Sequence, residues 1–168
     1  MNHPARQFWF GNYWWLTPVA SVGAIAIILA MASEESRLSL IASVIGGAFG
    51  VLYFIQKQML DETQLFERLF SQFNKRYADL NDKLQDIRAG RMADEQKARK
   101  VLDDYFNLCA EEYLFYSEGR IHPAAWQSWC RGMIDHFTHE SIIGHWNREV
   151  KSGSYYGLTL ETIQKGAT

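Results

Sequence analysis

The chain has 168 residues, of which 48% are hydrophobic and 21% are charged, and its formal net charge is -2. Only four charged residues precede Lys57, and the remainder of the chain carries 15 Lys plus Arg against 17 Asp plus Glu. These nearly equal numbers of basic and acidic residues exclude the strongly basic surface with which proteins wrap nucleic acid. The two cysteines, Cys109 and Cys130, are too few for a disulfide framework, so we expect both to be reduced, buried thiols.

Two long segments without a charged side chain make up most of the N-terminal third. They cover residues 7–33 and 38–56, and the polar sequence SEESR joins them. A helix rises 1.5 Å per residue, so about 18 to 20 residues span about 27–30 Å, roughly the hydrocarbon thickness of a bilayer. The pattern predicts a transmembrane hairpin over residues 15–56, with helices at 15–32 and 38–56.

Aromatic residues crowd the N-terminal segment, residues 1–14, ahead of the first predicted helix. Aromatic rings with a polar edge favour the headgroup level of a membrane, so the predicted interfacial anchors are Trp9, Tyr13, Trp14 and Trp15. Pro18 is expected in the first helical turn, where its missing N–H costs nothing. A cleaved signal peptide ending at residues 30–32 (AMA) is the competing interpretation, which the aromatic leading region with its single arginine disfavours.

Small side chains recur at helical spacing in the second predicted membrane helix. They define a small-residue stripe of Ala42, Gly46, Gly47 and Gly50. In lipid, small side chains let helix backbones approach closely, so we expect the stripe to pack against the first helix, against another subunit, or both. No ionisable residue lies inside either helix, which disfavours a proton relay or a coupled-ion site.

Positive residues flank the hairpin at both ends. Arg6 and the terminal amine precede it, Lys57 and Arg68 follow it, and the connection carries two Glu against one Arg. Because positive residues favour the cytoplasmic side, the sequence predicts a multi-pass membrane protein with two helices and both termini in the cytoplasm.

Residues 57 to about 88 are predicted to form one long amphipathic helix that continues from the second membrane helix. Apolar residues recur at heptad spacing, which defines a predicted helix seam of Phe66, Phe70, Phe73, Tyr77, Leu80 and Leu84. So many aromatic residues suit a two-stranded coiled coil poorly. We therefore expect the seam to pack against later helices of the same domain, with a seam between subunits as the alternative.

Three shorter helices are expected next, at about 94–118, from Pro123 onward and at 140–150. Asp94 is the predicted N-cap of the first, Gly119 ends it, and Pro123 opens the next. Residues 57–150 are thus predicted to form a cytoplasmic helical domain, and residues 151–168 a C-terminal tail of a loop and a last short turn. The expected fold class is all-α, with a two-helix transmembrane hairpin, a long amphipathic helix and a small cytoplasmic helical bundle.

Residues able to support chemistry are present, but they lack the spacing of a catalytic or metal site. Three histidines lie near Cys130 and Glu140 without a zinc-binding spacing, so we expect ordinary, partly exposed side chains at His136, His139 and His145. Four carboxylates are assigned to the solvated face of their helix, namely Asp103, Asp104, Glu111 and Glu112. We therefore predict no catalytic residue, no enzyme activity, no cofactor, no metal and no small-molecule substrate.

Five basic residues gather between the long helix and the helix that follows it. They are Arg88, Arg91, Lys97, Arg99 and Lys100. Because Asp94 and Glu95 lie among them, a solvated loop is one interpretation of this group. A docking site for RNA, DNA or an acidic partner is the other.

Three stretches of the chain resemble a family of small bacterial membrane proteins, some of them described as phage abortive-infection proteins. The stretches are FNKRYADLNDKL at 73–84, DYFNLCAEEYLFYSEGRI at 104–121 and WQSWCRGM at 126–133. The chain is also similar to two-helix membrane proteins that occur as toxic effectors in retron anti-phage systems, which pair a reverse transcriptase with a noncoding RNA. The resemblance covers about residues 57–146 and the two-helix arrangement, and it supplies no catalytic residue.

The resemblance implies a bacterial inner-membrane effector of antiviral defence that a cytoplasmic partner holds silent until infection. The expected partners are the lipid bilayer and a cytoplasmic protein or ribonucleoprotein, such as a reverse transcriptase with noncoding RNA or DNA. Freed copies would form a homo-oligomer through the small-residue stripe and the helix seam, and would permeabilise the membrane. The alternative is a membrane-anchored adaptor or scaffold that only recruits a cytoplasmic protein or ribonucleoprotein.

Overall fold

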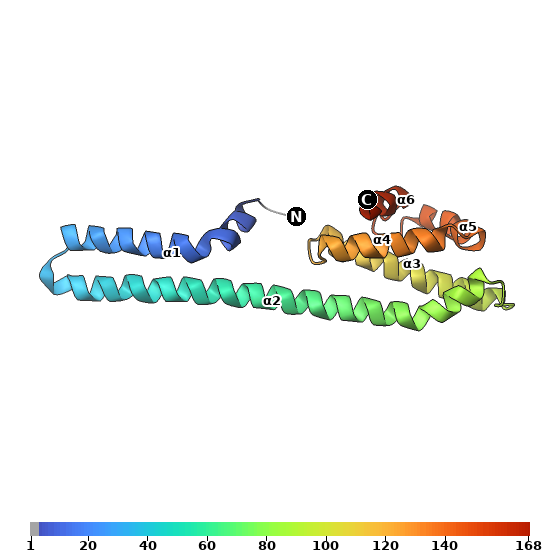
Figure 1. Cartoon of the computed structure of the whole chain (residues 1–168), viewed down its shortest axis with the longest axis horizontal. Helices are drawn as coiled ribbons and strands as arrows, with labels where there is room; N and C mark the ends of the chain where they lie inside the picture. Colours follow the sequence, from blue (N-terminus) through green and yellow to red (C-terminus); the bar gives the residue numbers. More distant parts are fainter. Residues whose placement is uncertain (1–3) are drawn as a thin grey trace. The chain divides into compact units, whose positions relative to one another are not determined.

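The structure is a computed structural model that describes the backbone of residues 4–168 and the side chains of Phe8 and residues 11–168. Within that part of the chain every regular element is helical, which confirms the predicted all-α fold. The elements in chain order are α1 (Pro4–Met31), α2 (Glu34–Arg88), α3 (Glu95–Ser117), α4 (Pro123–Phe137), α5 (Glu140–Glu149), the 3-10 turn η1 (Val150–Ser152) and α6 (Leu160–Ala167) (Figure 1).

These elements belong to two compact units. The hairpin unit ends at Gln64 and holds α1 with the first part of α2, and the bundle unit runs from Leu65 to Thr168. The predicted domain boundary lay at residue 57, whereas the bundle unit begins at Leu65. The residues between these positions are mostly polar, and α2 has no buried residue before Leu69, so they lie outside the bundle core.

The connection between the two hairpin helices is tighter than the predicted SEESR turn. Helix α2 already begins at Glu34, because the carbonyl of Ser33 accepts hydrogen bonds from the N–H groups of Ser36 (3.1 Å) and Arg37 (3.2 Å). Glu34 and Glu35 therefore occupy the first turn of α2, where the helix dipole favours negative charge.

The N-terminal aromatic segment is continuous with the first membrane-length helix. Because α1 begins at Pro4, Pro18 lies inside the helix and not in its first turn, so the predicted start of this helix is wrong. A proline inside a helix removes one backbone hydrogen bond and leaves the carbonyl four residues earlier, here that of Trp14, without its helical donor. Proline is common in the first turn of a helix, but a helix can also continue through it, as α1 does at Pro18.

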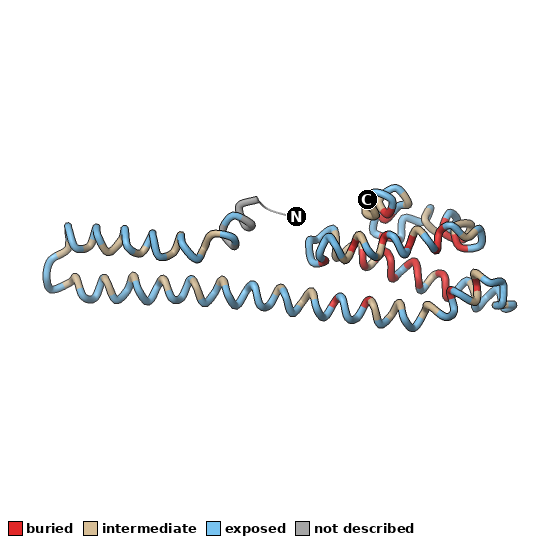
Figure 2. Tube along the Cα trace, viewed as in Figure 1, coloured by how far each residue is buried: buried red, intermediate tan, exposed pale blue. Residues whose placement is uncertain are grey.

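Both helices of the hairpin unit expose apolar side chains. Ile27 on α1 is 61% exposed, and Phe49 and Phe54 on α2 are 68% and 65% exposed. Figure 2 shows no buried residue along the described part of α1, whereas buried residues are frequent in α3 and α4. By length and composition, both α1 and the apolar part of α2 are able to cross a membrane.

The predicted helix seam lies in the bundle unit. Five of its six residues are buried or partly buried, namely Phe66, Phe73, Tyr77, Leu80 and Leu84. The sixth, Phe70, is 39% exposed and stacks on Trp129 of α4, with the ring centroids 5.7 Å apart. Leu69, which the heptad spacing left out, is also buried. The seam therefore packs within one chain, and its exposed part is the edge at Phe70.

Cap residues set the lengths of the bundle helices as the sequence predicts. At the start of α3, the Asp94 side chain accepts hydrogen bonds from the N–H groups of Gln96 (3.0 Å) and Lys97 (3.1 Å). Gly119 adopts a left-handed conformation with a φ of 73° just after α3 ends, and Pro123 is the first residue of α4. The short connection between these helices lets their apolar faces pack together.

The C-terminal segment, which was predicted to be a tail, contributes to the core of the bundle unit. Tyr155 is 6% exposed and stacks on Trp146, with the ring centroids 5.2 Å apart. Leu158 and Ile163 are 1% and 0% exposed, and α6 packs along α4. The sequence gives little sign of this, because a helix as short as α6 is stabilised mainly by tertiary packing.

Gly166 allows α6 to approach α4 closely. A β-carbon at this position would lie 2.5 Å from Nε1 of Trp126 and 2.6 Å from Sγ of Cys130, and real β-carbons essentially never come so close to another atom. Trp126 and Cys130 are both buried, so neither side chain has much room to move away.

We expect Gly166→Ala to destabilise the bundle unit by about 1–3 kcal/mol, the usual cost of overpacking a close-packed core. Urea unfolding of the full chain in detergent micelles, followed by circular dichroism, measures this change. Gly144→Ala is the matched control, because the atom nearest to its added β-carbon, on the Arg148 side chain, is 3.9 Å away. Equal stability of the two variants would contradict the close approach of α6.

Candidate functional site

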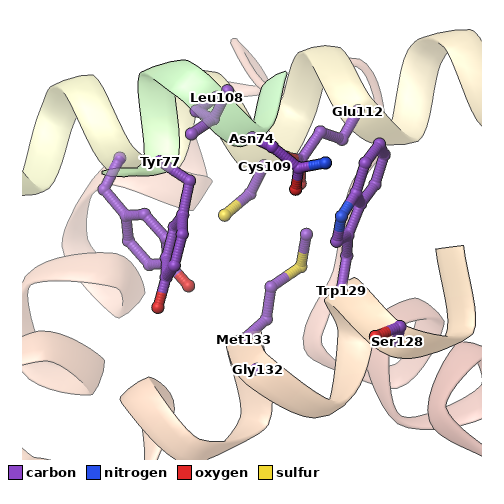
Figure 3. Close-up of a pocket in the computed structure, with 10 residues that line it drawn as sticks. Asn74, Tyr77, Leu108, Cys109, Glu112, Ser128, Trp129, Gly132 and Met133 are labelled. Carbon is purple, nitrogen blue, oxygen red and sulfur yellow. The ribbon is translucent and has the colours of Figure 1, made fainter. Parts of the chain in front are cut away.

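Three helices of the bundle unit enclose a pocket of about 220 Å³. Its lining residues are Asn74 and Tyr77 of α2, Tyr105, Leu108, Cys109 and Glu112 of α3, and Ser128, Trp129, Gly132 and Met133 of α4. In Figure 3 the sulfur atoms of Cys109 and Met133 point into the space between the helices. Ser128 and Gly132 are exposed, so the pocket opens to solvent beside α4.

Helical spacing explains why these α3 residues share the pocket. Tyr105, Cys109 and Glu112 are separated by four and three residues, and such residues lie on one helical face. Tyr105 and Cys109 belong to the core, and Glu112 continues the same face with only 5% exposure. The assignment of Glu112 to the solvated face is therefore wrong, although its spacing from Cys109 was a signal that could have placed it correctly.

Burial dominates the chemistry of the Glu112 carboxyl group. Desolvation raises its pKa from 4.5 to about 8, although the positive charge of Arg76 acts in the opposite direction. Among the described residues, none supplies a hydrogen bond to this carboxyl group. Glu112 is therefore mostly a neutral carboxylic acid at pH 7.

The guanidinium of Arg76 forms its hydrogen bonds with the neighbouring carboxylate. It donates to both oxygens of Glu111, at 2.5 and 3.2 Å, and this contact is the main reason that the pKa of Arg76 is raised. Each of these two side chains is 35% exposed, so solvent screens the pair. The charge of Arg76 thus acts on the pKa of Glu112, but Arg76 donates no hydrogen bond to this carboxyl group.

A buried histidine lies beside the pocket. The hydroxyl of Tyr77 lies 3.0 Å from Nε2 of His136, and the imidazole ring is also within 5.2 Å of the Tyr105 ring, centroid to centroid. Burial lowers the pKa of His136, and the charge of Arg88 acts in the same direction. Nδ1 of His136 is buried without a partner among the described residues. The prediction of a partly exposed side chain at His136 is therefore wrong. The side chain is 2% exposed, because α4 turns this face toward α2 and α3.

The lowered pKa of His136 makes folding sensitive to acid. The unfolded chain takes up the proton near the ordinary histidine pKa of about 6.5, whereas the folded chain resists it. Stability is therefore lost as the pH falls below that value toward the lower folded-state pKa.

We expect His136→Gln to reduce the loss of thermal stability of the full chain between about pH 6.5 and 5. Both this variant and the control, His139→Gln, are made in a Glu112→Gln background, because Glu112 titrates in the same range with the opposite effect. His139 is only partly buried. An acid slope that His136→Gln leaves unchanged would show that another group is responsible.

His145 forms a second buried polar cluster, between α3 and α5. Its Nε2 lies 2.7 Å from Oδ1 of Asp103, and its Nδ1 lies 3.2 Å from the guanidinium of Arg148. Because a guanidinium only donates, Nδ1 is the acceptor and Nε2–H donates to Asp103. His145 is 5% exposed, so the prediction of a partly exposed side chain is wrong here as well. Within the described residues, no group of three His, Cys, Asp or Glu side chains is placed to hold a metal ion.

Both cysteines are free and buried, as the sequence predicts. Burial raises the pKa of Cys130 to about 12 and that of Cys109 well above its ordinary value. The nucleophilic form of cysteine is the thiolate, so neither side chain is an activated nucleophile at neutral pH. Cys109 contributes to the pocket as an apolar wall.

The five basic residues proposed for partner docking lie around the connection between α2 and α3. Four of them form ion pairs with acidic neighbours: Arg88 with Asp135, Arg91 with Asp86, Lys97 with Asp94 and Arg99 with Glu95. The fifth, Lys100, is exposed. These pairs reduce the positive charge available to a partner, although exposed ion pairs are weak enough for an acidic partner to replace them.

The predicted interfacial anchors belong to α1. Trp14 is 68% exposed, Tyr13 is partly exposed, and the indole N–H of Trp15 donates to Oδ1 of Asn12 at 3.0 Å. The Trp9 side chain lies outside the described residues. An exposed indole whose N–H is already bonded within the helix is compatible with both lipid and water.

The small-residue stripe lies on α2 in the hairpin unit, and Ala42, Gly46, Gly47 and Gly50 are all exposed. A β-carbon added at any of the three glycines would have no neighbouring atom within 4 Å in the described part of the chain. The stripe therefore does not pack closely against α1, which was one of the two expected arrangements. It is accessible to lipid or to another helix.

Comparison of the chain with protein-family models, with curated proteins and with solved structures found no match.

Proposed function

We propose that this protein is a bacterial inner-membrane effector of anti-phage defence, which permeabilises the membrane when a cytoplasmic partner releases it. The observation that carries the proposal is the exposed apolar surface of the hairpin unit, whose two helices have the length and composition of membrane spans. Apolar surface of this extent, left exposed by the described part of the chain, requires lipid or a partner around it.

The charge distribution supports an orientation with the bundle unit in the cytoplasm. Arg6 precedes α1 and Lys57 follows the apolar part of α2, whereas the connection carries Glu34 and Glu35 with one arginine. That arginine, Arg37, forms an ion pair with Glu34, so the connection offers no free positive charge of its own. The positive-inside rule then assigns both termini to the cytoplasm.

Cysteine labelling tests this orientation. We expect a cysteine introduced by Ser36→Cys to react with a membrane-impermeant maleimide added to spheroplasts, and one introduced by Lys151→Cys to react only after lysis. The native thiols do not interfere, because Cys109 and Cys130 are buried. Labelling of the second variant in intact spheroplasts would contradict the cytoplasmic bundle.

The step from membrane protein to effector has two supports. One is the resemblance of residues 73–84, 104–121 and 126–133 to a family that includes abortive-infection proteins, together with the two-helix arrangement that retron membrane effectors also have. The other is the small-residue stripe, whose exposure leaves it open to a second copy. The helix seam supports association less, because most of it is buried within one chain. We therefore propose that released copies associate through α2, and that the silencing partner is a cytoplasmic protein or a ribonucleoprotein containing a reverse transcriptase.

Membrane permeability tests the effector function. We expect expression of the protein alone to admit a membrane-impermeant dye and to depolarise bacterial cells within one generation, and the neighbouring genes to suppress both effects. The double variant Gly46→Leu/Gly50→Leu is expected to abolish dye entry because it fills the stripe. Gly23→Leu is the matched control, since it adds the same side chain to α1 at a site that is also open. Cells that stay polarised at high expression without a partner would rule out permeabilisation.

A membrane-anchored adaptor is the second candidate, and the separate compact core of the bundle unit favours it. An adaptor predicts that the bundle unit keeps its partner when the hairpin is replaced by an unrelated two-helix hairpin. It also predicts that the intact protein is harmless at high expression. Affinity capture with the two hairpins, combined with the dye assay, separates the two functions.

A further inference from the structure

We infer that the pocket beside Glu112 binds the primary ammonium group of a small organic amine. The inference concerns the bundle unit alone and does not depend on the membrane function proposed above.

The first argument is the carboxyl group of Glu112, which lines the pocket. Glu112 is only 5% exposed and lines the pocket, but no described residue supplies it with a hydrogen bond. The nearby guanidinium of Arg76 is held by Glu111 and does not reach it. A bound cation with N–H donors would supply a positive charge and hydrogen bonds that the described residues do not supply to this carboxylate.

The second argument is the aromatic lining. Three aromatic rings line the same pocket as the carboxyl group, those of Tyr77, Tyr105 and Trp129. Aromatic rings attract cations through the negative charge on their faces, and this attraction is larger in a site shielded from water. The structure thus combines a buried acid with aromatic walls, which is the chemistry that recognises an organic ammonium ion.

The third argument separates a primary ammonium from a quaternary one. A primary ammonium has three N–H donors, whereas a quaternary ammonium has none. The pocket offers the carboxylate of Glu112 and the amide oxygen of Asn74 as acceptors, and both residues belong to its lining (Figure 3). Acceptors inside an aromatic site therefore favour the ion that can donate to them.

Size and access limit the rest of the ligand. The pocket volume of about 220 Å³ is below the usual range of drug-sized ligand sites, roughly 300–1,000 Å³. Leu108 and Met133 supply an apolar wall, and the exposed Ser128 and Gly132 mark the entrance. A short alkyl chain therefore fits better than a ligand with further charged groups.

Proton release is expected to accompany binding. The raised pKa of Glu112 means that the cation displaces the carboxyl proton, so affinity falls by about tenfold per pH unit well below that pKa. Glu112 and its neighbours shift one another's pKa values by electrostatic interaction. The neighbouring titratable and charged groups come from all three helices: Arg76 and Tyr77 of α2, Tyr105, Cys109 and Glu111 of α3, and Cys130 of α4.

Calorimetric titration of the full chain in phosphatidylcholine nanodiscs tests the inference, with n-butylammonium as the probe. These lipids contain no primary ammonium group that would compete. The titration is made at about pH 8.5, where Glu112 is mostly ionised and an alkylamine, with a pKa near that of lysine, about 10.4, is still protonated. We expect one molecule bound per chain, and 1-butanol, the neutral ligand of the same size, to bind at least tenfold more weakly.

Two variants complete the test. Glu112→Gln keeps the shape of the side chain without its charge and is expected to weaken n-butylammonium binding at least tenfold. Asp104→Asn removes an exposed carboxylate from the same helix and is expected to leave the affinity within about twofold, because attraction between exposed charges is screened. No detectable heat at tens of millimolar n-butylammonium, equal binding of 1-butanol, or equal affinity of the Glu112→Gln variant would each overturn the inference.

Discussion

Replacing Glu112 with glutamine is expected to stabilise the bundle unit by about 3 kcal/mol at pH 7, because the folded wild-type chain holds a proton there that the unfolded chain has already released. The pKa of Glu112 is raised from 4.5 to about 8 by burial. A carboxyl group with a raised pKa gives its full stability below the unfolded value and loses it as the pH rises toward the folded value. Between these two pH values the wild-type chain therefore becomes steadily less stable, and the Glu112→Gln variant does not.

Urea unfolding of the full chain in micelles at about pH 4.5, 7 and 9 measures the effect, with wild type and variant converging at the lowest pH. Asp104→Asn is the matched control, because Asp104 is an exposed carboxylate on the same helix. Its pH dependence is expected to follow that of wild type. A Glu112→Gln variant with wild-type stability at every pH would mean that the carboxyl group has a partner or is hydrated.

Replacing Phe106 with alanine is expected to destabilise the bundle unit by about 3–5 kcal/mol, the usual cost of removing a fully buried aromatic ring. Phe106 is 0% exposed, and its ring contacts aromatic residues from three other parts of the unit. The centroid distances are 5.9 Å to Phe137 of α4, 5.1 Å to Trp146 of α5 and 6.3 Å to Tyr155 in the C-terminal segment. One cavity therefore weakens the contacts of α3 with α4, α5 and the C-terminal segment at once.

Hydrogen exchange shows whether the C-terminal segment shares this core. We expect Phe106→Ala to reduce protection in α3, α5 and α6 by a similar factor, because a single cooperative unit opens as a whole. Phe70→Ala is the control, since Phe70 is 39% exposed and is expected to change stability by about 1 kcal/mol or less. Loss of protection confined to α3 would show that the C-terminal segment folds independently.

Local sequence signals were enough to predict most of the helices. The uncharged segments around residues 7–33 and 38–56 predict two membrane-length helices, and Asp94, Gly119 and Pro123 mark helix ends correctly. These signals work because a cap or a breaker acts within one turn of its own residue, without reference to the rest of the fold. Pro18 is the exception, because a proline is compatible both with the first turn of a helix and with a position inside one, so the residue alone does not fix where the helix begins.

The candidate site could not be predicted in the same way. The carboxylates at 111 and 112 are adjacent in sequence, yet one pairs with Arg76 from α2 and the other lies in the pocket. Spacing along the chain predicts partly exposed side chains for His136 and His145, whereas both are buried because of the helices that pack against them. A helical repeat shows which residues share a face, but it does not show how wide the buried part of that face is.

By itself, then, the sequence determined the all-α class, the two membrane-length helices, the two ends of α3 and the start of α4, because each of these follows from charge, length or contacts between near neighbours in the chain. Only the tertiary structure decided that Glu112 is buried, that three helices form a pocket around it and that α6 packs into the core at Gly166. Those features depend on contacts between residues far apart in the sequence, and the environment that shifts a pKa exists only once those residues have come together.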